Sequence, residues 1–105
     1  MSKKPRRRLE PKDRKRELVD AGIVAARQVG FNNLRREDVA RVAGCANGTL
    51  SLHFNTLGQF KRALMREAIK RGELRIIAEG LAIRDPNALK APEDIKQKAI
   101  TAAAI

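Results

Sequence analysis

Aromatic residues and cysteine are scarce in this chain of 105 residues, which has three Phe, one Cys and neither Trp nor Tyr. Ala, Leu, Ile and Val must therefore form the core, and these side chains suit helices that pack closely together. The single Cys45 excludes an internal disulfide, and together with the lone His53 it cannot complete a structural zinc site. We therefore expect neither a metal nor a cofactor.

Long apolar segments are also missing. No run approaches the roughly 20 apolar residues that cross a bilayer, and no apolar signal-peptide segment follows the basic start. The sequence has no strand-like alternation, no phosphate-binding GxxxxGK[ST] motif and no catalytic constellation of nucleophile, base and orienting group. These absences favour a soluble, cytoplasmic, all-α protein that is not an enzyme.

Positive charge is what the chain has in excess, with a formal net charge of +11. Residues 1–16 hold nine Lys or Arg against Glu10 and Asp13, a net charge of +7 that leaves +4 for residues 17–105. Residues 1–11 also contain two prolines and almost nothing apolar, so we predict a flexible basic arm there. Such an arm favours a polyanionic partner, and the alternative is a solubilising tail.

The segment 36–54, REDVARVAGCANGTLSLHF, is the most informative local pattern. Its apolar residues predict one helix up to Gly44, which ends the helix because glycine adopts a left-handed conformation at little cost. A second short helix follows over residues 47–53 and buries Leu50 and Phe54. This is the layout of the helix-turn-helix, whose second helix enters the DNA major groove.

Helical periodicity predicts six helices, at about residues 12–29, 35–43, 47–53, 57–84 and 86–90 and from Pro92 onwards. The fourth, at ~1.5 Å per residue, would be roughly 40 Å long, with Gly72 and Gly80 as alternative ends or kinks. It has two apolar stripes, of which one can cover the first three helices and the other a partner or the C-terminal segment. We divide the chain into the arm (1–11), a DNA-binding domain (12–55) and a dimerisation segment (56–105).

Several motifs, spaced without a gap from about residue 14 to residue 60, resemble those of TetR-type (tetracycline-repressor-like) transcriptional regulators. They are the segment Arg16 to Gly22, Gly30-Phe31, Asp38-Val39-Ala40, Ala43-Gly44, Gly48-Thr49-Leu50 and His53-Phe54. The resemblance implies a three-helix DNA-binding head, a fourth helix that leads to a dimerisation body, and a two-fold dimer. Such proteins usually repress transcription from a palindromic operator.

Four positions depart from the pattern of that family. Ser51 stands where the family typically has a phosphate-binding Tyr, and Leu57 where it has a Lys. Leu34 replaces the usual Thr cap of the second helix, and Ala26 replaces a core aromatic residue. The chain also ends where the large ligand-binding body would begin, which indicates a minimal regulator or a fragment. Because only about 20 residues follow the predicted fourth helix, we expect no walled pocket for a small-molecule effector.

The predicted recognition helix supplies four candidate DNA contacts. Asn47 can pair bidentately with adenine, or it can merely cap the helix. Gly48 would allow close approach to DNA, or it serves turn geometry. Thr49 can contact a thymine methyl or a phosphate, with a local cap as the alternative, and Ser51 can donate to a phosphate or a base.

Basic residues supply the predicted contacts to the DNA backbone. Arg35 and Arg36 begin the second helix, where free N–H groups favour a phosphate, and a solvated helix start is a poor alternative because positive charge there opposes the dipole. We expect them, with the arm, to replace the missing Tyr and Lys. Arg6, Arg7 and Arg8 can enter a minor groove, and non-specific phosphate attraction is the alternative.

Two further residues complete the predicted interface. His53 matches a family position beside the DNA backbone, and packing is the alternative; Lys61 can reach a flanking phosphate or remain an exposed helix charge. The sequence therefore favours a sequence-specific double-stranded DNA-binding regulator, a homodimeric repressor in the cytoplasm on the nucleoid. The alternative is an architectural or a plasmid or phage segregation protein with the same head. A third hypothesis is a protein whose fourth helix binds another regulator.

Overall fold

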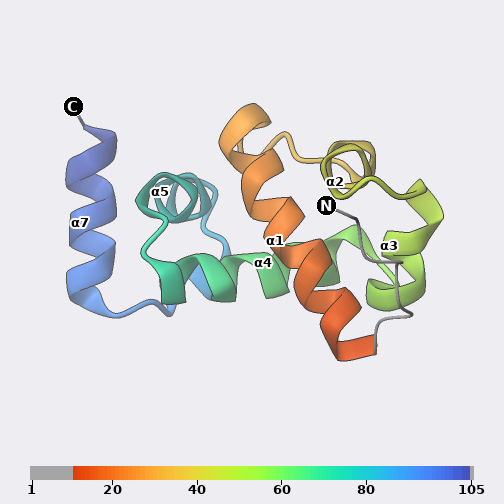
Figure 1. The fold of residues 1–105 in the computed structure, drawn as a ribbon. Helices are drawn as coiled ribbons and strands as arrows, with labels where there is room; N and C mark the ends of the chain where they lie inside the picture. Colours follow the sequence, from red (N-terminus) through yellow and green to blue (C-terminus); the bar gives the residue numbers. More distant parts are fainter. Residues whose placement is uncertain (1–10, 105) are drawn as a thin grey trace, which may run out of the picture.

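The computed structural model describes residues 11–104, and all of the regular secondary structure there is helical (Figure 1). The helices are α1 (Pro11–Val29), α2 (Arg36–Ala43), α3 (Asn47–Phe54), α4 (Leu57–Arg71), α5 (Leu74–Ala82), α6 (Pro86–Leu89) and α7 (Glu93–Ala103). The predicted all-α fold is confirmed, and the first three helices lie within a residue or two of their predicted bounds. The arm predicted over residues 1–11 falls almost entirely outside the described residues.

The first three helices pack around a shared core, as the sequence predicted. Gly30 follows α1 with a φ of +94°, a left-handed conformation that favours glycine. Phe31 then turns back into the core and is only 1 % exposed. Leu18 of α1, Leu34 of the connection to α2 and Leu50 of α3 are buried in the same cluster. The core therefore fixes how α3 sits on α1 and α2.

One phenylalanine ring joins three of the helices. Phe60 of α4 is fully buried, and its ring meets that of Phe54 of α3 edge to face at a centroid distance of 5.1 Å. Gly22 lies where α1 crosses α4, and a Cβ there would lie only 2.5 Å from Cζ of Phe60. The missing side chain at Gly22 therefore allows α1 and α4 to close on this ring.

The fourth helix does not run to residue 84 as predicted, because α4 ends at Arg71 and is only about 22 Å long; of the alternative ends that the sequence offered, Gly72 is the one found. Gly72 takes a left-handed conformation with a φ of +71°, and its N–H donates to two carbonyls of the last turn of α4. The chain then turns into α5, which places Ile76 and Ile77 in the core. Burial of each side chain contributes about 1.5–3 kcal/mol, which a straight helix would lose.

The second apolar stripe predicted for the fourth helix is mostly covered by the C-terminal helices of the same chain. Met65 is fully buried, and its methyl group lies where Gly80 of α5 has no side chain. Ile69 remains half-buried. Of the two occupants that the sequence left open, the C-terminal segment therefore takes most of this stripe.

The C-terminal helices begin as their sequence predicts. The Asp85 carboxylate accepts two backbone N–H groups in the first turn of α6, each at 3.1 Å, so it caps this short helix. Helix α7 packs against α5 with Ala99 fully buried. The predicted apolar side of α7 is used only in part, since Ala102 and Ala103 are exposed.

Side-chain contacts join the first three helices and the connection between them to α4 and α5. They are the ion pairs Arg27–Glu73 and Arg71–Asp20 and the hydrogen bond from the Phe31 N–H to the Glu79 carboxylate at 2.5 Å. The hydrogen bond from Arg27 lowers the pKa of Glu73 below its ordinary value, and the charge of Arg27 adds to this shift. Residues on both sides of the predicted boundary at 55/56 belong to one hydrophobic core.

Candidate nucleic-acid interface

A tight turn positions α3 against α2. Gly44 has a φ of +73°, and the N–H groups of Gly44 and Cys45 both donate to the Ala40 carbonyl, at 2.8 and 3.0 Å. This is the left-handed helix ending that the sequence predicted. Leu50 then anchors α3 in the core at 2 % exposure, so the opposite side of α3 faces outward.

The first turn of α3 has no side-chain cap. Its N-cap residue is Ala46, which has no polar side chain, and no side-chain hydrogen bond closes this end. The alternative interpretation, in which Asn47 or Thr49 serves as the cap, is therefore wrong. The amide of Asn47 is exposed and is left free to meet a base edge.

The exposed side of α3, which we call the outer face, carries no charge. It consists of Asn47, Gly48, Ser51 and Leu52, with the half-buried Thr49 and His53 at its edges. A Cβ at Gly48 would meet nothing within 4 Å, and the φ of this residue is not in the left-handed range. Neither packing nor turn geometry therefore requires a glycine here, although glycine within a helix costs about 0.5–1 kcal/mol relative to alanine. Gly48 therefore leaves a stretch of bare backbone on the outer face.

Leu52 is a residue of the outer face that sequence interpretation missed. Its side chain is 80 % exposed. Helical geometry is the signal that points to it, since at about 100° per residue Leu52 lies about 200° from Leu50. An apolar side chain at this place can contact the methyl group of thymine in the major groove.

Arg35 and Arg36 stand at the start of α2, as predicted, but the helix end there is partly satisfied. The Arg35 N–H donates to the Asp38 carboxylate at 2.9 Å, and Asp38 also pairs with Arg41. The carboxylate therefore competes with any phosphate for the N–H groups of this end. A phosphate bound here would be held mainly by the two guanidinium groups.

The first turns of α1 place further cations beside the end of α3. Nζ of Lys15 lies 5.8 Å from the centroid of the Phe54 ring. Lys12 and Arg16 are exposed on the same turns. The sequence assigned the basic contacts outside α2 to Arg6, Arg7 and Arg8 of the arm and to Lys61, and the folded chain adds these cations of α1 next to the candidate interface.

Lys61 points to a different place from the one predicted. Its Nζ lies 4.8 Å from the centroid of the Phe31 ring, and the side chain is half-buried. Burial lowers the pKa of Lys61, and the nearby Asp85 carboxylate opposes this shift. The side chain is thus engaged with the core edge of its own chain, and it does not belong to the candidate interface.

Arg6, Arg7 and Arg8 lie outside the described residues, so their minor-groove contact stays a prediction. Within residues 11–104, no three His, Cys, Asp or Glu side chains gather in a way that could hold a metal ion. None of the helices described there combines the length and apolar character that a membrane span requires.

Comparison with known proteins assigns no family to the chain. No family model, no curated protein and no solved structure matches it. The resemblance to TetR-type regulators therefore stays a prediction that rests on the motifs between residues 14 and 60. Function has to be inferred from the chemistry of the interface itself.

Proposed function

We propose that this protein is a sequence-specific double-stranded DNA-binding transcriptional regulator, a repressor that occupies a palindromic operator in the cytoplasm on the nucleoid. Helix α3 enters the major groove with its outer face. The uncapped, exposed Asn47 beside the bare backbone of Gly48 is the observation that carries this proposal. Figure 1 shows α3 at the end of the molecule opposite to α7.

Charge supports the same function. The chain has a net charge of +11, and exposed cations at the start of α2 and in the first turns of α1 flank the neutral outer face. Phosphate contacts position a protein on a duplex, whereas contacts to base edges distinguish sequences. Arg35 and Lys15 would serve the first purpose and Asn47 and Leu52 the second.

A homodimer would place two copies of α3 on one operator. The prediction assigned its contact to the fourth helix and the C-terminal helix, but the apolar side chains of α4 are largely covered within the chain. We therefore place the two-fold contact on the C-terminal helices, where Ile83 and Ile100 are 52 % and 51 % exposed. A two-fold contact uses the same patch on both subunits, which matches a palindromic operator.

Selection of bound sequences from a random DNA pool tests this proposal. The expected result is a palindromic consensus whose half-sites are one helical turn apart, with affinity that falls by a log–log slope of about 0.9 per phosphate contact as salt rises. Equal footprinting protection of every sequence would contradict the claim of a repressor.

An architectural or segregation protein is the second candidate function, and one observation favours it. The outer face of α3 has no Arg or Lys, although Arg and Lys on guanine are the commonest specific base contacts. Discrimination between sequences would then be modest. Cooperative coverage of many sites, with little effect on a nearby promoter, would support this candidate over the repressor.

A further inference from the structure

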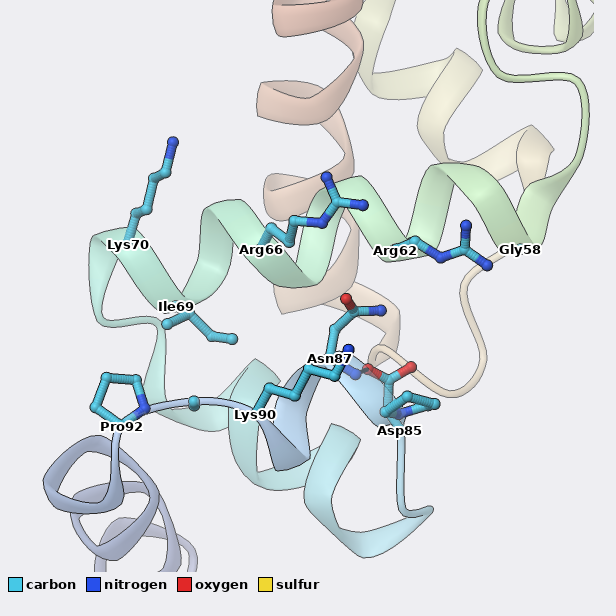
Figure 2. A pocket seen from close by; sticks show the side chains of 11 residues that line it. Gly58, Arg62, Arg66, Ile69, Lys70, Asp85, Asn87, Lys90 and Pro92 are labelled. Carbon is cyan, nitrogen blue, oxygen red and sulfur yellow. Dashed lines mark hydrogen bonds between the residues drawn. The ribbon is translucent and has the colours of Figure 1, made fainter.

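A groove of about 790 Å³ lies between α4 on one side and α6 with the connection to α7 on the other (Figure 2). It is open to solvent, and Ile69, Ala91 and Pro92 give it an apolar lining. From the sequence we expected no walled pocket, because the fourth helix was predicted to end near residue 84 and too few residues would follow it. Because α4 ends at Arg71, the helices that follow can form the second wall.

A row of cations borders this groove along α4. Arg62, Arg66 and Lys70, which we call the α4 row, follow one another at intervals of four residues and span about 12 Å of the helix. All are exposed, and Lys90 stands on the opposite side of the groove. Figure 2 shows Arg62, Arg66 and Lys70 on α4 and Lys90 across the groove from that helix, with the Ile69 side chain on the groove side of α4.

The α4 row has no acidic partner within residues 11–104. Arg71, directly after it, pairs with both Glu67 and Asp20, so neighbouring carboxylates are already used. Asp85 at the edge of the groove is committed to the cap of α6. Like charges four residues apart on a helix repel, so the isolated chain gains nothing from this arrangement. An anionic partner would offset the repulsion among these cations, because each of them would attract its negative charges.

We propose that this groove binds an acidic segment of another protein, whose carboxylates meet the α4 row and whose apolar side chains cover Ile69 and Pro92. A helix with glutamates at intervals of four residues repeats its charges at the same ~6 Å spacing as α4. Both the charge and the apolar lining of the groove are then matched by one partner.

The mixed chemistry of the groove distinguishes this partner from DNA. A phosphate backbone would meet the cations but would bring no apolar group to Ile69, Ala91 or Pro92. The groove also lies along α4 and α6, whereas the outer face of α3 lies at the end of the molecule (Figure 1). An acidic partner can therefore occupy the groove while α3 remains accessible, and the inference does not depend on the proposed DNA-binding function.

Fluorescence anisotropy with a labelled helical peptide of about 15 residues tests the proposal. The peptide has glutamates at intervals of four residues and leucines on the adjoining face. We expect the Arg62→Gln/Arg66→Gln variant of the full chain to bind it at least about tenfold more weakly than the wild type. Glutamine keeps the helix propensity of arginine, so α4 stays intact, which circular dichroism checks.

A matched control removes two cations elsewhere. Arg75 of α5 and Lys98 of α7 are exposed and lie outside the groove, so Arg75→Gln/Lys98→Gln should change peptide affinity by less than about twofold. An equal loss in both variants, or no binding by the wild type, overturns the proposal. So does unchanged binding when the leucines of the peptide are replaced by serine.

A titration with DNA separates this inference from the proposed function. Both double variants are titrated with a random-sequence duplex, and their affinities should agree. A larger loss for Arg62→Gln/Arg66→Gln would identify the α4 row as a DNA surface and overturn the inference. Failure of the wild type to select any DNA sequence would instead overturn the proposed function, and the peptide result would stand apart from it.

Discussion

Helices α3 and α4 each present to solvent a surface that packing does not use, and these two surfaces differ in charge. The outer face of α3 has an amide, a hydroxyl, an apolar side chain and bare backbone. The α4 row has three cations at regular intervals. A neutral surface gains little from general attraction to a polyanion, so its contacts depend on which groups it meets. A cationic row attracts any anion and depends on geometry only for its strength.

Charge alone therefore does not single out one binding surface on this basic protein. The most regular cationic row of the described chain lies on α4, while α3 is neutral and receives its cations from α1 and α2. Under the proposed function, sequence selectivity and attraction to phosphate would be carried by different elements. Four experiments test this difference between the two surfaces and are given in order of decreasing expected effect.

Leu50→Ala should have the largest effect of the four, a loss of folding stability, because Leu50 anchors α3 in the core. Truncation of a fully buried leucine lowers the free energy of unfolding by about 2–5 kcal/mol. Leu52→Ala, on the exposed side of the same helix, should change it by less than about 0.5 kcal/mol. Urea denaturation of both variants measures the difference. Similar losses for the two leucines would show that the outer face of α3 is not free.

Asn47→Ala should weaken binding to the selected operator by about 1–3 kcal/mol, the range for one bidentate base contact. Binding to random-sequence DNA should hardly change, because Asn47 carries no charge. Asn32→Ala, in the exposed turn after α1, is the matched control and should leave both affinities as they are. Electrophoretic titrations on the two duplexes give the ratio. An equal loss on both would assign Asn47 to the DNA backbone.

Arg35→Gln/Arg36→Gln should flatten the salt dependence of DNA binding, since each lost phosphate contact removes about 0.9 from the log–log slope. Arg62→Gln/Arg66→Gln removes the same charge from the α4 row and should leave the slope unchanged. Titrations at several salt concentrations compare the two variants directly. A smaller slope for the α4 variant than for the α2 variant would reverse the assignment of the two surfaces.

The ion pair between Arg27 of α1 and Glu73 at the start of α5 should give a small pH dependence of stability. The pKa of Glu73 is lower in the folded chain than its ordinary 4.5, so the pair stabilises the fold above that pH. The contribution is lost as pH falls below about 4.5 through the folded-state pKa. Thermal unfolding from pH 7 downwards should show this loss in the wild type.

Two variants check the origin of that pH dependence. Glu73→Gln and Arg27→Gln should each remove the same part of the curve, because either one abolishes the pair. Glu37→Gln, an exposed carboxylate of α2 that forms no ion pair within residues 11–104, should keep it. An unchanged curve in Glu73→Gln would show that other carboxylates dominate the acid response.

Local signals predicted much of this fold. Gly30 and Gly44 end helices in the left-handed conformation, and Asp85 caps α6, because these residue types act through their immediate backbone neighbours. Thr56 likewise accepts the N–H of Gln59 at the start of α4. Each of these interactions spans at most four residues, so the sequence alone can indicate it.

Long-range packing decided what the sequence could not. The apolar periodicity continues across Gly72, which the sequence left open as an end or a kink, and the end of α4 there places Ile77 in the shared core. Lys61 looks like an exposed helix charge until Phe31 comes to lie beneath it. A helical projection of residues 47–54 could have predicted the exposure of Leu52. The groove between α4 and α6 depends on the turn after Arg71, which the apolar periodicity does not indicate.

The hydrogen bond from the Phe31 N–H to Glu79 joins residues that are 48 positions apart. An amide in the segment that leads into α2 is therefore protected from exchange with solvent only while α5 stays docked. The hydrogen-exchange rate of the Phe31 amide would therefore report the undocking of α5. Any event that displaces α5 would free the Phe31 amide. The Glu79 carboxylate thus links the docking of α5 to the conformation of the segment that leads into α2.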